Sequence, residues 1–499
     1  MARSYVWRWA IILTATVVAF WQTWANVIAE ARAGAAVGYY GIVIVLAVVA
    51  AAGLARKPHR QLQIFDKQAD AITGVLALVI SILIKALVVP RYSEQYQVLH
   101  LDVLAAGVFL AGCTALMFGL RPFGRFWPAW ALLLACGPLT YRSLVVIFGG
   151  TSWSAGVVVT LFSAAAVTIA FALTVREAAV IGATVVVLGG FTVLLLSWLA
   201  PGAPLIVSQA VPSVTASVAT ILLVRAHRRR QGANRYTRGP ALVPSVTWRT
   251  AVTCIVAGVL VGLVSLPERS PAIVAAGPPL TGSPALEVPA GWFETARTDY
   301  PWVRRYFGPT ATLTRQYLSA QPSNEAVGAF ADSVLAEPGV LGFLSGQSVE
   351  PPHTARTIVI DTFTDPHPAQ LDVYPDATLY DMHKARRSEP RIVSLGHGVI
   401  GTLSTLIDET AYLTETMLVF SWQRGDEAQR VVIIAVDNPE PDAMFPEPQP
   451  SMASNMRTLI EVLFRGNTAI ADITPEFKDA GLVTTAGRQI VAAQFGEEP

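Results

Sequence analysis

The residues best suited to chemistry in this sequence are ionisable side chains inside long apolar runs. Arg142 follows Cys136 and Pro138, and the proline should break a helix there and free backbone carbonyls. His100 and Asp102 lie at the edge of the preceding apolar run, from which they could approach Arg142. Charged groups at membrane depth are rare and usually paired, so we expect a polar site here. The alternative is an arginine whose long side chain reaches the membrane surface.

A second charged position is the stretch VREAAVIG, which places Arg176 and Glu177 between two apolar runs. The pair is either a short turn between two membrane helices or what remains of a catalytic site. An adjacent ion pair at a membrane surface needs no functional explanation, which favours the turn. Lys85, five residues before Pro90, is expected to extend its ammonium group to the membrane surface.

The composition is that of a membrane protein. Of 499 residues, 53% are hydrophobic and only 14% are charged, with a mean hydropathy of +0.48, and the apolar residues form runs long enough to span a bilayer. The net charge of +1 gives no reason to expect a nucleic-acid partner. Cys113, Cys136 and Cys254 all lie within apolar runs, so we expect no disulfide framework.

The chain divides into three parts. Residues 1–266 read as a transmembrane helical domain, residues 267–290 as a linker rich in Pro, Ala and Gly, and residues 291–499 as a mixed, water-soluble domain. The predicted fold is therefore an α-helical polytopic membrane bundle followed by an α+β extracytoplasmic domain. About nine spans of ~20 residues are expected: 6–28, 34–55, 69–90, 101–120, 126–148, 153–174, 179–200, 205–225 and 248–266.

Basic residues predict the orientation of these spans, because Lys and Arg near span ends stay on the cytoplasmic side. They gather before the first span and after the second, fourth, sixth and eighth. The N-terminus is then cytoplasmic, and an odd number of spans places the C-terminal domain outside. Ala29-Glu30-Ala31 resembles a signal-peptide cleavage site, but the preceding apolar run is too long, so we interpret it as a retained helix.

The C-terminal domain shows both strand and helix patterns. The runs TATLTRQYL, TARTIVIDTF, RIVSLGHGVIGTL, ETMLVFSW and RVVIIAVDN are rich in β-branched residues and predict strands. QRGDEAQ between the last two predicts a hairpin. SNEAVGAFADSVLAE and SMASNMRTLIEVLFRG have helical periodicity and begin with capping residues.

One stretch of this domain, DTFTDPHPAQLDVYPDATLYDMH, is rich in possible metal ligands. It contains Asp361, Asp365, His367, Asp372, Asp376, Asp381 and His383. Their spacing matches no metal-binding loop, and a polar surface loop punctuated by prolines is the favoured interpretation. The domain has no nucleophile elbow, glycine-rich phosphate loop or cysteine, and the sequence implies no cofactor.

The first 145 or so residues resemble the exosortase/archaeosortase family of multi-spanning membrane transpeptidases. The likeness is carried by FWQTWANVIAEARAGAAVGYYGIVIVLAVVAAAGLARKP, where GYYG stands in place of the family's usual His-Gly, and by LDVLAAGVFLAGCTALMFGLRPFGRFWPAWALLLACGPLTY. Gly119, Arg121, Trp127, Pro128 and Pro138 match the family's Trp-Pro helix and following break. Gly291-Trp292, LVFSWQRGD and NMRTLIEVLF are faintly similar to the family's extracytoplasmic accessory domain.

The resemblance implies a cysteine nucleophile in a Val-x-Glu-Ala-Cys-Ser-Gly-type motif. VREAAVIG matches it at Val175, Glu177 and Ala178, but Ala179 replaces the cysteine, and alanine cannot form the covalent intermediate. The family's active site also faces outside, whereas the charge distribution places Glu177 inside. Cys136 with Arg142 and His100 could form a substitute Cys–Arg–His set, although a buried thiol is more often a small hydrophobe.

These observations predict an exosortase-like membrane protein with a degenerate catalytic centre, in the plasma membrane of a bacterium. It would take part in surface-protein or exopolysaccharide export, with the bilayer around it and a secreted protein tail or lipid-linked precursor as its partner. The alternatives are a transporter component, or a membrane-anchored assembly platform whose external domain binds an envelope partner. A working site would require Arg142, His100 and Glu177.

Overall fold

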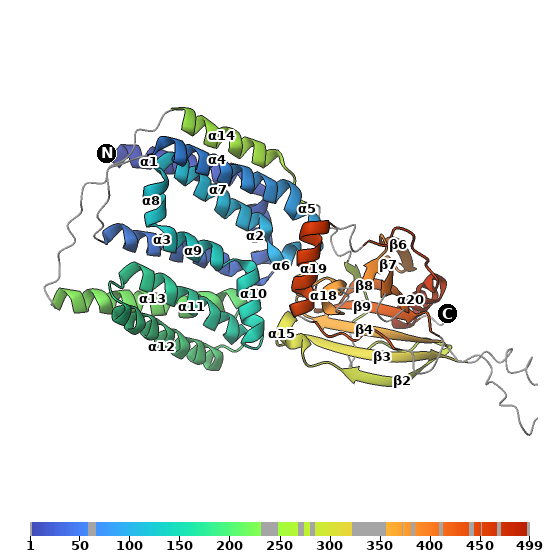
Figure 1. The fold of residues 1–499 in the computed structure, drawn as a ribbon. Coiled ribbons are helices and arrows are strands. Elements are labelled where there is room, and N and C mark those ends of the chain that lie inside the picture. Colours follow the sequence, from blue (N-terminus) through green and yellow to red (C-terminus); the bar gives the residue numbers. More distant parts are fainter. Residues whose placement is uncertain are drawn as a thin grey trace, which may run out of the picture. The chain divides into compact units, whose positions relative to one another are not determined.

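The computed structural model describes residues 2–57, 66–230, 248–267, 274–279, 285–321, 356–371, 373–380, 385–408, 413–438, 444–450, 452–466 and 471–496. The chain forms two compact units, Met1–Arg269 and Ser270–Pro499 (Figure 1). The first is helical and the second is built on a sheet, as the composition predicts. The boundary lies within the predicted linker, part of which belongs to the second unit, as shown below.

The helical unit consists of long apolar helices interrupted by short ones. Its described helices are α1 Ala2–Ala19, α2 Trp21–Arg32, a 3-10 turn Ala36–Gly38, α3 Tyr39–Arg56, α4 Lys67–Leu83, a π-turn Ile84–Val88, α5 Val89–Arg91, α6 Tyr96–Leu99, α7 Leu101–Phe118, α8 Leu120–Arg125, α9 Trp127–Ala135, α10 Pro138–Ile147, α11 Ser152–Phe171, α12 Val175–Leu199, α13 Leu205–Arg230 and α14 Trp248–Leu263.

Six helices of the described chain are long and apolar enough to cross a membrane, and two bent pairs raise this number to as many as eight. The pairs are α1 with α2, bent by 73°, and α9 with α10, bent by 63° at the break before Pro138. The predicted count of nine is not confirmed, because α14, with 16 residues, is shorter than a typical span.

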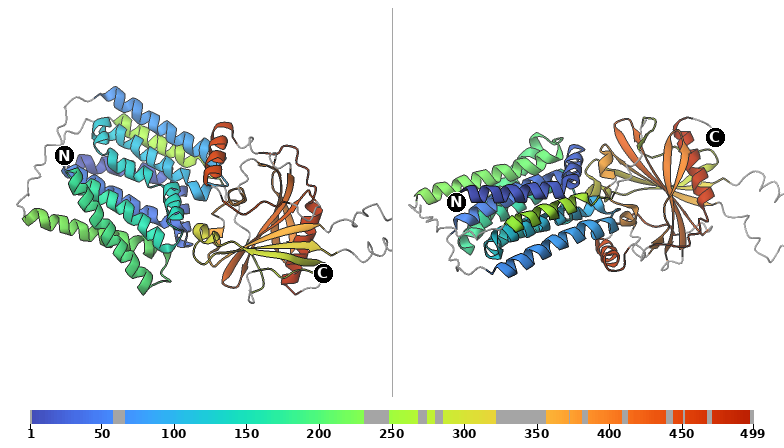
Figure 2. Two further views of the ribbon diagram at one scale, coloured as in Figure 1. Left: turned by 60° about the horizontal axis from the view of Figure 1, so that its bottom comes forward. Right: turned by 90° about the horizontal axis from the view of Figure 1, so that it is seen from above.

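Small residues let the helices approach closely. A methyl group on Gly53 of α3 would lie 2.3 Å from the Ala170 Cα of α11, and one on Gly156 of α11 would lie 2.6 Å from the Ser208 carbonyl of α13. Such contacts between backbones are typical of membrane helices, whose association cannot rely on the hydrophobic effect. Figure 2 shows the resulting side-by-side packing of the long helices.

Lys85 departs from its predicted position, because its side chain is fully buried and does not reach the membrane surface. Its ammonium group donates to the Ala19 carbonyl at 3.0 Å and to the Val261 carbonyl at 2.9 Å, and lies 5.2 Å from the centre of the Phe20 ring. Both carbonyls lie near helix ends, where backbone acceptors lack partners within the helix. Lys85 therefore connects the bend between α1 and α2 to α14.

The second unit contains a sheet in which the nine described strands lie in the order β2-β3-β4-β9-β8-β7-β5, with β6 also beside β7 and β1 beside β8. All pairs are antiparallel except the β1–β8 pair. The strands are β1 Val274–Ala276, β2 Trp292–Asp299, β3 Thr312–Ala320, β4 Thr357–Asp365, β5 Ala385–Arg387, β6 Arg391–Gly396, β7 Val399–Asp408, β8 Leu413–Arg424 and β9 Glu427–Val436.

The helices of this unit are α15 Val303–Phe307, α17 Pro368–Leu371, α18 Asp376–Leu379, α19 Met452–Arg465 and α20 Ala480–Gln494. The predicted hairpin is present, α19 forms where predicted, and four of the five predicted strand runs contain one strand each. The fifth, RIVSLGHGVIGTL, is divided by a turn at residues 397–398 into the paired strands β6 and β7. The helix predicted at SNEAVGAFADSVLAE lies outside the described residues. β1 and the buried Leu286 show that part of the predicted linker 267–290 belongs to the sheet unit.

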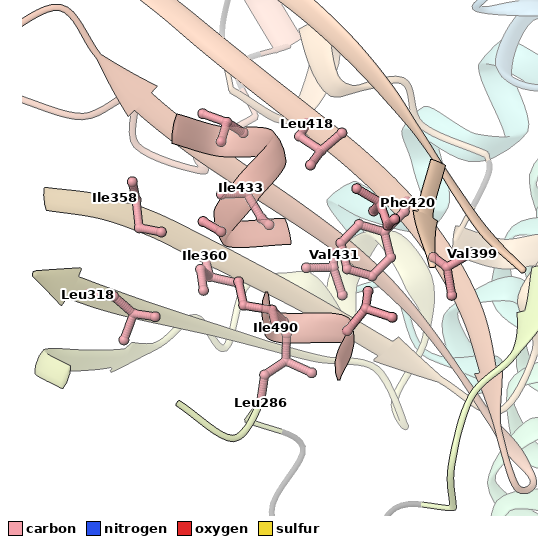
Figure 3. Close-up of a cluster of buried hydrophobic side chains, with 14 of the residues drawn as sticks. Leu286, Leu318, Ile358, Ile360, Val399, Leu418, Phe420, Val431, Ile433 and Ile490 are labelled. Carbon is pink, nitrogen blue, oxygen red and sulfur yellow. The ribbon is translucent and has the colours of Figure 1, made fainter. Parts of the chain in front are cut away.

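One face of the sheet carries the apolar core of the unit. Ile360, Phe420 and Ile433 project from central strands toward Ile490 of α20, which covers this face (Figure 3). Trp422 completes the cluster, and its ring nitrogen donates to Gln429 at 3.0 Å. Burial of these large side chains supplies most of the driving force for folding of the unit.

The other face holds buried ion pairs, and these overturn the surface-loop interpretation for Asp361 and Asp376. Asp365 is buried as well, His367 is exposed, and Asp372, Asp381 and His383 lie outside the described residues. Asp361 is fully buried and accepts two hydrogen bonds from Arg315, at 2.7 and 2.6 Å, and one from the Tyr380 hydroxyl at 2.6 Å. Burial, and then the Asp361 carboxylate, raise the pKa of Tyr380 well above its usual range, so the hydroxyl remains a donor. Asp376 likewise pairs with Arg430.

The packing of α12 against α11 gives a direct test of the helical arrangement. A methyl group on Gly189 would lie 2.2 Å from Cγ2 of Thr160, whereas one on the neighbouring Gly190 would meet nothing within 4 Å. We expect Gly189→Ala to lower the free energy of unfolding by about 1–3 kcal/mol through overpacking. Gly190→Ala should leave it unchanged or raise it. Thermal unfolding in detergent measures both, and equal effects would contradict this packing.

Candidate functional site

The candidate site lies at one end of the helical unit, where α2 ends and α7 begins. His100 is completely buried there between two carboxylates. Its Nε2 atom lies 3.1 Å from Oε2 of Glu30, and its Nδ1 atom lies 3.9 Å from Oδ1 of Asp102. Asp102 is also fully buried, and Glu30 is nearly so. We call Glu30, His100 and Asp102 the acid–imidazole group.

Two further side chains position this group. The Tyr96 hydroxyl donates to Oδ2 of Asp102 at 2.6 Å, and the Asn26 amide lies 3.4 Å from the same hydroxyl oxygen. The Tyr96 ring also lies 5.3 Å from the imidazole. These contacts join the end of α2, the short helix α6 and the first turn of α7.

The backbone at His100 is unusual for its residue type. With φ of 41° it adopts the left-handed conformation, and it stands where α6 ends and α7 begins. Side chains with a Cβ rarely adopt this conformation, which costs about 1–2 kcal/mol. The short connection between the two helices directs the imidazole inward, toward Glu30.

Arg142 lies in the first turns of α10, near the acid–imidazole group. Its charge acts on the His100 imidazole and on the hydroxyls of Tyr39 and Tyr141. Tyr39 and Tyr141 stack with their ring centres 3.8 Å apart, and Gln209 donates to the Tyr141 hydroxyl at 2.6 Å. The structure therefore brings His100, Asp102 and Arg142 into one region, as their positions in the sequence predict.

Cys136 is close to this region but sits in apolar surroundings. Its carbonyl accepts a hydrogen bond from the Tyr39 hydroxyl at 3.2 Å, while its side chain belongs to a buried apolar cluster with Leu132 and Leu133. A nucleophilic thiol needs a neighbouring cation or base and access to substrate. These surroundings favour a packing role for Cys136 over membership of a Cys–Arg–His set.

Glu177 lies at the other end of the helical unit. It accepts from the Leu173 amide at 3.0 Å and pairs with Arg228 at 3.3 Å. Lys57, which follows α3, donates to the Ala172 carbonyl beside it. Because Tyr39 starts α3, the two ends are separated by its 18 residues, or about 27 Å. Glu177 is thus not part of the site. The turn between α11 and α12 lies at residues 172–174, and VREAAVIG itself forms the first turns of α12, so the predicted turn is displaced toward the N-terminus by a few residues.

The site can bind and move protons, because it places an imidazole against two carboxylates. Among the described residues, no group of three His, Cys, Asp or Glu side chains has the arrangement of a metal site. Comparison with protein-family models, with curated proteins and with solved structures finds no match for this chain. The resemblance to exosortases stays a prediction.

Sequence reasoning missed Glu30, Tyr96, Asn26 and Gln209 as parts of this region. Glu30 drew notice only as the centre of a sequence like a cleavage site, although an acidic residue ending an apolar run was a usable signal. The contact between Glu30 and His100 joins residues 70 positions apart, which no periodicity within either run could indicate.

The separation of the two ends predicts opposite accessibility. In a background without Cys113, Cys136 and Cys254, single cysteines at Glu177 and at the exposed Ser93, close to His100 in the chain, should be labelled from opposite sides of the membrane. A membrane-impermeant thiol reagent on intact and permeabilised cells measures this. Labelling of both from one side would contradict the placement of Glu177.

The acid–imidazole group should also act as a unit. Glu30→Gln and His100→Gln each disturb the buried contact between the imidazole and the carboxylate, and loss of a hydrogen-bonding partner of a buried group typically costs about 1–3 kcal/mol. We expect the double variant to lose much less than the sum of the two. Glu177→Gln, which breaks a half-exposed pair, is the control and should cost at most about 1 kcal/mol. Additive effects in thermal unfolding would argue against the coupling.

Proposed function

We propose that this chain is an exosortase-like integral membrane protein, catalytically degenerate, which takes part in export of surface proteins or exopolysaccharide in a bacterial cell envelope. Several apolar helices of spanning length support a multi-pass membrane protein. The sheet unit that follows supports the likeness to a family whose members can carry an accessory domain. In this proposal the N-terminus is cytoplasmic and the sheet unit is extracytoplasmic.

The observation that carries the proposal is the complete burial of His100 between Glu30 and Asp102 among apolar helices. Removing such groups from water costs several kcal/mol per ion, and well-packed apolar residues would usually stabilise a bundle as well or better. Intramembrane ionisable groups therefore mark functional sites by default. We infer that the group, with Arg142 beside it, holds a polar segment of the exported molecule.

Two features support a holding role over turnover. Ala179 stands at the position that the family's motif gives to the nucleophile, and it lies on α12 at the end of the unit remote from His100. The thiol that is closest to the site, that of Cys136, packs among apolar side chains. A protein tail or a lipid-linked precursor would thus be bound at the site and passed on, without a covalent enzyme intermediate.

The second candidate is a membrane-anchored platform whose sheet unit binds an envelope partner. It is favoured by the independence of the sheet unit, which has its own apolar core and its own internal ion pairs. A transporter component is less well supported, because the described part of the helical unit buries few charged side chains.

Complementation of a deletion strain tests the proposal. We expect deletion to reduce surface-protein or exopolysaccharide content, and His100→Gln or Arg142→Gln to restore less than about one-tenth of the wild-type level, since a loss of roughly 1.4 kcal/mol in binding is tenfold. Glu177→Gln should complement fully. Immunoblots of the membrane fraction control for expression.

The outcomes separate the two candidates. Normal surface content in the deletion strain would refute a role in export. Loss on deletion, with full activity of the His100 and Arg142 variants, would remove the site from the mechanism and support the platform.

A further inference from the structure

Helix α19 presents an apolar stripe to the surroundings of the sheet unit. Met456, Ile460, Leu463 and Phe464 are all exposed, Phe464 by 81%. Their spacing of four, three and one residues places them on one face, because residues at i, i+4, i+7 and i+8 share a side of a helix. Large apolar residues gathered in this way on a soluble surface mark an interaction site.

The stripe covers only part of the circumference of α19. Val462 is buried and lies about 100–160° around the helix from the stripe residues. Arg457 and Glu461 border the stripe on its other side and form a mostly exposed pair with a separation of 3.5 Å. The helix therefore has a buried side, an exposed apolar stripe and a charged flank, and such an amphipathic pattern is typical of a helix that lies in a membrane interface.

The chain connection supplies the partner. The apolar helix α14 ends at Leu263, and β1, which is paired with β8, begins at Val274. The intervening residues 264–273 can span at most about 35 Å. A unit of this size has a radius of gyration of about 17 Å, and α19 with its 14 residues is about 21 Å long. The membrane surface is thus always within reach, at a high effective concentration.

We propose that α19 is an interfacial helix that lies on the lipid bilayer with Met456, Ile460, Leu463 and Phe464 inserted at the headgroup boundary. The occupant of the stripe is the membrane that holds the helical unit of the same chain. The insertion fixes which side of the sheet unit faces the bilayer. The proposal is independent of the likeness to exosortases, because it uses only the stripe and the length of the connection.

Lipid-specific quenching on the full-length protein tests this. Phe464 is replaced by cysteine in a background without the three native cysteines, labelled with the environment-sensitive dye NBD, and reconstituted into phosphatidylethanolamine–phosphatidylglycerol vesicles. A matched label at the exposed Asp426, in the β8–β9 turn, serves as control. Lipids with a doxyl group on the acyl chain should quench the dye at position 464 at least twofold more than at position 426.

A second variant checks that the stripe causes the contact. Ile460→Asp, combined with the label at position 464, should reduce the quenching to the level at position 426, because a charge opposes insertion. Size-exclusion profiles verify the folding of each variant. Equal quenching at positions 464 and 426 would overturn the proposal. The proposal would also be overturned if the dye at position 464 showed blue-shifted emission that doxyl lipids do not quench, because this result would place the stripe against protein.

Discussion

The helical unit is organised around a fully buried imidazole that has two carboxylates for neighbours. His100 is fully buried within the helical unit, so its polar neighbours must come from within the chain. Glu30 can lie beside the imidazole only because the bend after α1 directs α2 toward α7. Asp102 can do so only because α7 starts immediately after His100. The left-handed backbone at His100 is the local cost of this arrangement. The bend, the helix junction and the carboxylates therefore depend on one another.

The sheet unit follows a different rule for its buried charges. Arg315 and Asp361 lie opposite each other in the β3–β4 register, so the pairing of the strands also pairs the charges. A shift of one strand by one residue would move one of these two charged side chains to the apolar face beside α20 and separate it from its partner. The ion pair thus specifies the register, while the apolar face supplies the driving force. The helical unit has no such ladder, and its polar contacts join helices at chosen points.

Much of this organisation could be predicted from the sequence. Apolar runs indicated the long helices, β-branched runs indicated the strands, and the proximity of His100 to Arg142 followed from their positions at span ends. The count of nine spans is not confirmed, because hydropathy does not show bends such as the one before α2 and α14 is shorter than a typical span. The prediction that Lys85 reaches the membrane surface was wrong, because its long side chain can reach either water or two free carbonyls. Only the packing of α14 decides between these two positions. α20 was missed because Ala486 and Gly487 weaken its apolar stripe.

The long-range contact of Lys85 has a consequence for how the protein is made. The ammonium group is synthesised 176 residues before the Val261 carbonyl that accepts one of its hydrogens. Domains generally fold in the order of synthesis, from the N-terminus. The first helices therefore enter the membrane with a cation whose coordination is incomplete until α14 emerges from the ribosome. The last helix of the unit completes the site of an early one, so that assembly of the helical unit closes just before the sheet unit is translated.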